Sequence, residues 1–305
     1  MLVEIDLSAE PDILLRRVEA EIRRRPFTDR KMGYAWTIVP LLPMLVGIAL
    51  LVALLTVVIS SIPNLQQAGG SVPAVAGFLT IYVFALISIY AVQIVNALAF
   101  YFLIDRRNRH FKRQQLLFDA VPKYLSALKS FASHENIGRL VELSEDSMFE
   151  EQDRPAGLWA ILSIFATPIV GLIVAHNLTQ DLRKHEERQS AFQQTLSSAL
   201  EEAGIAHPPI ASLKPHKRDP IVYIVLTVIT AGLFWIYWFY TLLKDYNEHF
   251  IDQAALEDQL LASLKPAMTC AACGGSIPQS VKFCPLCGAA QSSGKEIIDQ
   301  TKSDQ

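Results

Sequence analysis

Hydrophobic residues are gathered into long windows along this chain, and the longest window contains no charge. Between Gly33 and Ile104 there is no Asp, Glu, Lys or Arg. A run of about 20 apolar residues is enough to cross a hydrocarbon core of about 30 Å as a helix. The window therefore predicts two membrane-spanning helices, at about 36–62 and 74–104, joined by a polar turn.

Two further windows, 156–177 and 221–243, are also free of charged residues, and each has the length of one crossing. Pro168 lies inside the third window, which leaves a kinked span and a re-entrant hairpin open. The fourth window ends in Trp and Tyr residues, which are typical of the membrane interface. We predict a mainly α, polytopic helical membrane protein with about four spans, surface amphipathic helices and a small C-terminal zinc ribbon.

The alternation of apolar and polar segments divides the chain into six parts. We expect a basic amphipathic N-terminal helix at 1–31, two transmembrane helices at 32–104, a cytoplasmic helical linker at 105–156, two further transmembrane helices with amphipathic tails at 157–264, the zinc ribbon at 265–290, and a disordered tail at 291–305. The tail prediction is based on its polar composition.

A weak internal repeat follows the apolar windows. Tyr101, Leu103, Asn108, His110 and Phe111 recur at the same intervals as Tyr240, Leu242, Asn247, His249 and Phe250; the third window gives His176, Leu178 and His185, with Arg183 in place of the Asn and Glu186 in place of the Phe. Each window thus continues into an amphipathic tail. The three tail histidines could form a metal site, but no tail offers a second ligand at i+4. This favours histidines exposed at the level of the lipid headgroups.

Polar residues inside the windows offer little chemistry. Gln93 and Asn96 lie one turn apart on the second predicted span. Such amides usually hydrogen-bond to a neighbouring helix, although they could also line a conduction path.

There is no Ser/His/Asp set and no glycine-rich phosphate loop, so we expect no enzyme; an active site built from His134, Glu135 and Glu142 is the alternative.

All four cysteines lie near the C-terminus, in two Cys-x-x-Cys-Gly motifs. Cys270 and Cys273 form the first pair, and Cys284 and Cys287 form the second. Four thiolates suit a structural zinc ion, and cysteines confined to such pairs suit a reducing compartment. A redox dithiol is the alternative. We expect all four cysteines to bind zinc.

Two stretches resemble known families. Ile277 and the run Phe283, Cys284, Pro285, Cys287 and Gly288 resemble the small zinc ribbons of prokaryotic multidomain proteins. Thr230 to Gly232, Ile236 to Tyr240 and Lys244 to Glu248 resemble the signature of an uncharacterised two-span bacterial and archaeal membrane domain, covering about 157–248. The second resemblance implies membrane residence and no particular activity.

Basic residues predict the orientation of the chain. Seven Lys and Arg precede the first span, none lies between the first two spans, and nine lie in 105–156. By the positive-inside rule we expect a multi-pass plasma-membrane protein with both termini cytoplasmic. With four spans, however, the loop at 178–220 and its six basic residues would lie outside.

A net charge of -3 without a clustered basic face predicts no nucleic-acid binding. The expected partners are the lipid bilayer and a cytoplasmic protein, and a homo-oligomer is compatible with this sequence. We therefore expect a membrane-anchored adaptor or sensor that presents a zinc-binding interaction module. The alternative is a small transporter or channel subunit with a structural zinc ribbon.

Overall fold

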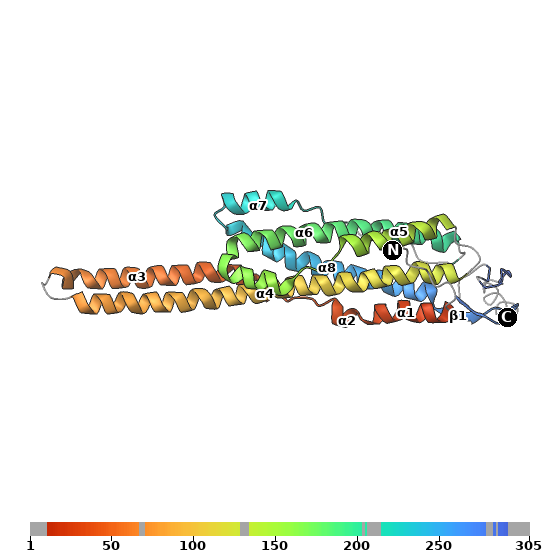
Figure 1. Cartoon of the computed structure of the whole chain (residues 1–305), viewed down its shortest axis with the longest axis horizontal. Helices are drawn as coiled ribbons and strands as arrows, with labels where there is room; N and C mark the ends of the chain where they lie inside the picture. Colours follow the sequence, from red (N-terminus) through yellow and green to blue (C-terminus); the bar gives the residue numbers. More distant parts are fainter. Residues whose placement is uncertain are drawn as a thin grey trace, which may run out of the picture.

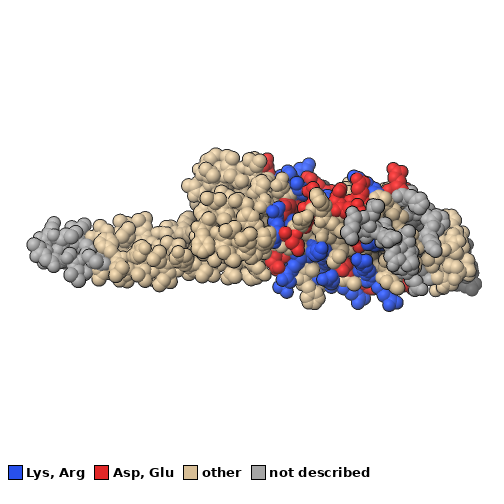
Figure 2. Space-filling model, viewed as in Figure 1, with Lys and Arg blue, Asp and Glu red and all other residues tan. Residues whose placement is uncertain are grey.

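A computed structural model of the chain describes residues 11–66, 71–128, 134–202, 205, 215–278, 283, 284 and 286–291. These residues are mainly helical, with one two-stranded sheet. The molecule is elongated, with helices running along its length (Figure 1). One half of the molecule shows no charged side chains in this view, and the charged side chains gather on the other half (Figure 2). The predicted mainly α fold is confirmed; the predicted disordered tail, apart from Gln291, lies outside the described residues.

A long apolar hairpin forms one end of the molecule. The short 3-10 helix η1 (Tyr34–Leu41) leads into α3 (Leu42–Gln66), and α4 (Ser71–Ala127) runs back beside it (Figure 1). Gly77 lets the two helices approach closely, since a Cβ at this position would lie 3.4 Å from Val57 Cγ1.

The apolar side chains of this hairpin face outward, as expected for contact with lipid. Exposed examples are Leu51, Val52, Ile59, Leu79, Phe84 and Ile87. Within the described part of the chain, three helical segments are long and apolar enough to cross a membrane: Tyr34–Ser60, Ala76–Ala127 and Ala156–Glu202. The chain therefore has the helices of a membrane protein.

The third apolar window is broken rather than straight. It lies in α6 (Ala156–Glu202), where Ala166 leaves the helical conformation with φ -139° and ψ 44°, two residues before Pro168. A proline disrupts the helix in the turn that precedes it, which accounts for the break. The chain therefore turns back here, and the rest of α6 runs toward the charged end (Figure 1).

The fourth window does not form the continuous span that we predicted. It is divided into α7 (Pro220–Ile229) and α8 (Leu233–Leu264) by a turn in which Ala231 has φ 48° and Gly232 φ 91°. Glycine tolerates this left-handed conformation, which ends α7 and reverses the chain. At 1.5 Å per residue, α7 extends over only about half of a hydrocarbon core of about 30 Å.

The charged end is a helical bundle built around three parallel tails. The C-terminal parts of α4, α6 and α8 run side by side in the same direction, away from the apolar end (Figure 1). Their buried Leu103, Leu178 and Leu242, one from each tail, belong to a core that also includes Phe100, Val170 and Trp238. A second core, which includes Leu117, Phe192 and Leu196, lies farther along the tails.

Two other helical segments run back toward the apolar end. The helices α1 (Pro11–Arg23) and α2 (Arg25–Thr28) precede the long hairpin, and α5 (His134–Glu150) precedes the broken hairpin of α6. In both cases a returning helix is followed by an apolar hairpin and then by a tail. The internal repeat seen in the sequence thus corresponds to a repeated structural unit.

The C-terminal module follows α8 directly. Strands β1 (Pro266–Thr269) and β2 (Ser276–Pro278) pair antiparallel, and Phe283 forms an isolated bridge with Ala290. Cys270, Ile277 and Cys284 belong to the same buried core as Leu264 and the N-terminal helix α1. The module is therefore packed against the far end of the bundle.

Candidate metal centres

The four cysteines of the C-terminal module converge as the sequence predicts. Their four sulfur atoms lie within 4.8 Å of one another, with Cys270 Sγ 3.8 Å from Cys287 Sγ and Cys273 Sγ 3.7 Å from Cys284 Sγ. All four thiols are reduced. Four thiolates at such separations could hold a tetrahedral metal ion, so the donor set fits the expected centre.

The two motifs have the same local geometry. The amide N–H of Gly274 donates to the carbonyl of Cys270 over 2.9 Å, and that of Gly288 donates to the carbonyl of Cys284 over 2.8 Å. Both glycines have positive φ, 69° and 77°, which a residue with a Cβ rarely adopts. The backbone amide of Cys273 lowers the pKa of Cys270 to about 6, which favours the thiolate needed for metal binding.

A second cluster lies inside the bundle, on the three parallel tails. His110 of α4, His185 of α6 and His249 of α8 each offer a ring nitrogen, and these nitrogens lie within 4.8 Å of one another. The three ring centres form a nearly equilateral triangle with sides of 5.3, 5.0 and 5.1 Å. We expected these histidines on the surface. That expectation is wrong, because all three are at most 1% exposed.

Each of these imidazoles faces one carboxylate through its Nδ1 atom. Nδ1 of His110 lies 3.0 Å from Asp29 Oδ1, Nδ1 of His185 lies 2.9 Å from Glu151 Oε1, and Nδ1 of His249 lies 3.2 Å from Glu186 Oε1. Each carboxylate also contacts a cationic or titratable partner, which is Arg113, Arg188 or His216 respectively. The cluster is thus three copies of one arrangement.

The charge states follow from burial and pairing. Burial lowers the pKa of His110 to about 3 despite the nearby Asp29, so its imidazole is neutral at pH 7. Burial would raise the pKa of Glu151, but His185 and Arg188 bring it down to about 2. Burial opposes ionisation of Glu186 in the same way, and His216 and His249 lower its pKa to about 2. The carboxylates are therefore ionised.

The residue after each histidine contacts the histidine of the next tail. Phe111 stacks on His185 with ring centres 4.2 Å apart, and Phe250 packs on His110 at 4.6 Å. Glu186, which stands where the repeat has Phe, contacts His249. The three contacts run in a cycle from α4 to α6, from α6 to α8 and from α8 to α4. Glu186, the one residue of these three that is not a Phe, therefore supplies the third carboxylate.

The repeated asparagines have a shared structural role. The side chain of Asn108 accepts from the backbone N–H of Arg154 and donates to its carbonyl, over 3.1 and 2.7 Å. Asn247 makes the same pair of bonds with the backbone of Met32, over 3.1 and 2.8 Å. These bonds hold the loops that follow Glu151 and Asp29, and so help to position both carboxylates.

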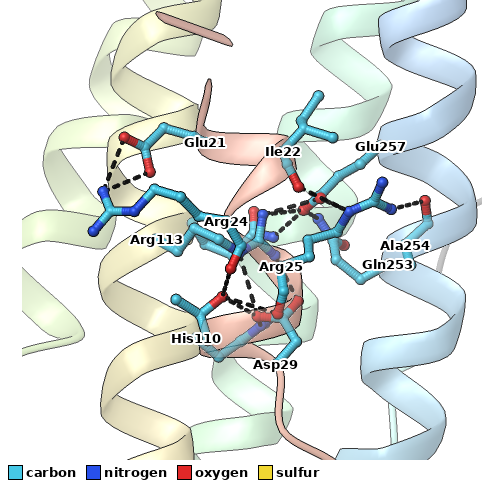
Figure 3. A network of polar contacts seen from close by, with 12 residues as sticks. Glu21, Ile22, Arg24, Arg25, Asp29, His110, Arg113, Gln253, Ala254 and Glu257 are labelled. Atoms are coloured by element: carbon cyan, nitrogen blue, oxygen red, sulfur yellow. Dashed lines mark hydrogen bonds and ion pairs between the residues drawn. The ribbon is translucent and has the colours of Figure 1, made fainter. Parts of the chain in front are cut away.

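A buried ionic network connects the cluster to α2 and α8. Arg113 lies between Asp29 and Glu257, with His110 beside Asp29 (Figure 3). One guanidinium nitrogen donates to both carboxylate oxygens of Glu257 over 2.8 and 2.9 Å, and the other donates to Asp29 over 2.7 Å. Arg25 donates to the carbonyl of Ala254 over 2.6 Å.

The amides in the second apolar window are engaged in helix packing. The hydroxyl of Thr167 in α6 donates to Gln93 Oε1 over 2.6 Å, and Asn96 Nδ2 donates to the carbonyl of Val92 in its own helix over 3.1 Å. The Gln93 contact is the interhelical hydrogen bond that the sequence favoured over a conduction path. Among the alternative enzyme residues, Glu142 is on an exposed face of α5 and pairs with Arg139.

No protein-family model, no curated protein and no solved structure matches this chain. The resemblances to a zinc-ribbon family and to a two-span membrane domain therefore stay predictions, supported by the residues named above and, for the ribbon, by the convergence of the four cysteines.

His216 gives the cluster a testable pH dependence. Its Nδ1 lies 2.8 Å from Glu186 Oε1, and this contact raises the pKa of His216 although burial opposes the shift. Below the unfolded pKa of about 6.5 the stabilisation is fully present, and it is lost as the pH rises through the higher folded pKa. We expect the free energy of unfolding to fall as the pH is raised above about 6.5.

The measurement is chemical unfolding of the purified chain at a series of pH values. His216→Gln should flatten this dependence, whereas His176→Gln, a change on α6 outside the cluster, should preserve it. An unchanged dependence in His216→Gln would show that another group is responsible.

Proposed function

We propose that this chain is a membrane-anchored adaptor or sensor, which presents a four-cysteine zinc-binding module to a protein partner on the cytoplasmic side. The observation that carries the proposal is the attachment of the module to the membrane helices. Helix α8 leads from the apolar end of the molecule to Leu264, and β1 of the module begins two residues later. Leu264 and Cys270 share one buried core, so the module is held against the bundle rather than tethered.

The exposed surface of the module suits a protein partner. Phe283 and Leu286 are 47% and 37% exposed, and both belong to the second cysteine motif. Exposed aromatic and aliphatic side chains beside a rigid turn are typical anchors of a protein interface. The closed set of four thiolates leaves no open position for catalysis, which supports a structural role for the zinc ion.

An orientation with all charged segments on one side supports a cytoplasmic module. We propose that only the long hairpin crosses the plasma membrane, and that the shorter apolar hairpins of α6 and of α7 with α8 enter it from the cytoplasmic face. The segment 178–220, with its six basic residues, then lies on the same side as both termini. This orientation agrees with the positive-inside rule, unlike the four-span arrangement.

The test is affinity capture of the full-length chain from cells after crosslinking, followed by mass spectrometry. Phe283→Ser should reduce the recovery of a specific partner at least about tenfold, as expected for loss of an interface anchor. Phe27→Ser, which changes an exposed Phe at 68% exposure in α2, is the matched control. Equal partner recovery from wild type and Phe283→Ser would contradict the proposed interaction surface.

A further inference from the structure

We propose that His110, His185 and His249 bind one transition metal ion, best fitted by Zn²⁺, through their Nε2 atoms. This centre is separate from the four-cysteine module and lies inside the helical bundle. Each tail helix supplies one ligand, so the metal would join α4, α6 and α8 at one point.

The spacing of the imidazoles fits such an ion. Nε2 of His110 lies 3.1 Å from Nε2 of His249. Tetrahedral zinc with Zn–N bonds of about 2.0–2.1 Å holds two of its nitrogen ligands about 3.4 Å apart and their ring centres about 5 Å apart. The three observed distances between ring centres are 5.0, 5.1 and 5.3 Å. The triangle is therefore close to that of a three-histidine zinc site.

The carboxylates select the tautomer that a metal requires. Nδ1 of His185 is hydrogen-bonded to Glu151, whereas Nδ1 of His110 and Nδ1 of His249 lie beside ionised carboxylates without hydrogen-bond geometry. A carboxylate beside Nδ1 favours the imidazole with its proton on that atom, and we assign this tautomer to all three rings. Each Nε2 atom then presents a lone pair toward the centre of the triangle. Three converging lone pairs repel one another unless a cation lies between them. A histidine ligand whose other nitrogen faces a carboxylate is the usual arrangement around protein-bound zinc.

An unsatisfied nitrogen points to the same conclusion. His185 is 1% exposed, and its Nε2 has no hydrogen-bond partner among the described residues. Leaving a buried polar atom without a partner is unfavourable, and a bond to a metal ion would offset that cost. The cluster thus contains a buried ring nitrogen that makes no hydrogen bond within the described part of the chain.

A layer of glutamines lies one helical turn beyond the histidines. Gln114, Gln189 and Gln253 each follow a cluster histidine by four residues and are buried. The Oε1 atoms of all three, and Nε2 of Gln189, also lack hydrogen-bond partners among the described residues. Three histidines leave a fourth position on a tetrahedral ion, which water usually fills. The glutamine oxygens could accept hydrogen bonds from such a water.

The choice of metal follows from the donors. Three neutral imidazoles suit Zn²⁺, Fe²⁺, Ni²⁺ or Cu²⁺, whereas Mg²⁺ and Ca²⁺ prefer oxygen ligands. Zinc fits best because it commonly binds three histidines in a tetrahedral site, and the distances between the three rings are close to those of such a site. Asp29, Glu151 and Glu186 around the rings also favour a dication in the centre.

The experiment measures metal content and Co²⁺ absorption of the full-length chain purified in detergent. Wild type should retain two zinc ions per chain. His185→Gln and Cys284→Ser should each retain one, and the double variant none. His176→Gln, the matched control on α6, should retain two. In Cys284→Ser, the remaining Co²⁺ should show ligand-field bands without thiolate-to-metal charge transfer.

A second variant keeps the test valid if His185→Gln does not fold. Glu151→Gln leaves all three ligands in place but changes the group that orients His185, so the zinc affinity of the histidine centre should fall about 10–100-fold.

Wild-type protein that holds only the metal bound by thiolates, or zinc content unchanged by His185→Gln, would overturn the proposal. In that case a proton shared between Nε2 of His110 and Nε2 of His249 would join these two imidazoles in place of a metal ion. Because the two centres are counted separately, failure of the four-cysteine module would not be mistaken for failure of this one.

Discussion

Replacing Arg113 with methionine is expected to lower the free energy of unfolding by about 3–5 kcal/mol, the usual cost of removing one partner of a buried ion pair. Arg113 is 1% exposed and neutralises two carboxylates at once, those of Asp29 and Glu257. Burial already raises the pKa of Glu257, and Arg113 is the main influence that lowers it. Without Arg113, the cationic partner that Glu257 retains is Arg25, at 3.5 Å, so the loss favours protonation of Glu257 or opening of the bundle.

Denaturant unfolding in detergent micelles, followed by tryptophan fluorescence, measures this change. The control is Arg23→Met, because Arg23 is an exposed residue that pairs with Glu19 at i,i+4 and should contribute less than about 1 kcal/mol. Combining Arg113→Met with Glu257→Leu should recover part of the loss, because no buried charge at position 257 then remains. A loss below about 1 kcal/mol for Arg113→Met would mean that water reaches the network.

Removing the metal from the four cysteines is expected to unfold the C-terminal module while the bundle stays folded. Structural zinc contributes about 10–16 kcal/mol to small domains of this kind, far more than so few residues gain from burying apolar surface. Within the described residues, the core of the module consists mainly of Cys270, Ile277 and Cys284. Two of these three are the proposed ligands themselves.

Hydrogen exchange of the amides of Gly274 and Gly288 measures this effect, since both donate to carbonyls within their motifs. Chelation, or Cys273→Ser, should remove their protection and leave the amides around Leu196 in α6 protected. Protection of the glycine amides that persists after chelation would contradict a metal-dependent module.

The parts of the structure that were predictable depend on local composition. The charge-free window at 33–104 indicates the long hairpin, and the spacing of the cysteines indicates their convergence. The division of the fourth window was also visible locally, because Gly232 is well suited to a left-handed turn. The window was assigned to one span because its uninterrupted hydrophobicity matched one crossing, and average hydropathy does not register a turn.

The histidine cluster was missed because its geometry depends on tertiary structure. A pair of ligands at i and i+4 indicates a metal site on a single helix. Here each of three helices contributes one histidine, so no such pair exists in the cluster. The carboxylates of Asp29 and Glu151 come from other helices and have no fixed spacing from His110 or His185. The equal intervals of the repeat, including the glutamine at i+4, were the signal that could have indicated a shared layer.

The cyclic contacts between the tails also bear on the origin of the chain. A homotrimer of one ancestral unit, with one histidine per subunit, would form the same triangle around a threefold axis. When the three units are joined in one polypeptide, the contacts along the three sides of the histidine triangle no longer have to be identical. The three sides of the triangle do differ, since His249 contacts Glu186 where the other two imidazoles contact a Phe ring. Fusion of duplicated units thus allows one side of a symmetric centre to change without altering the other two.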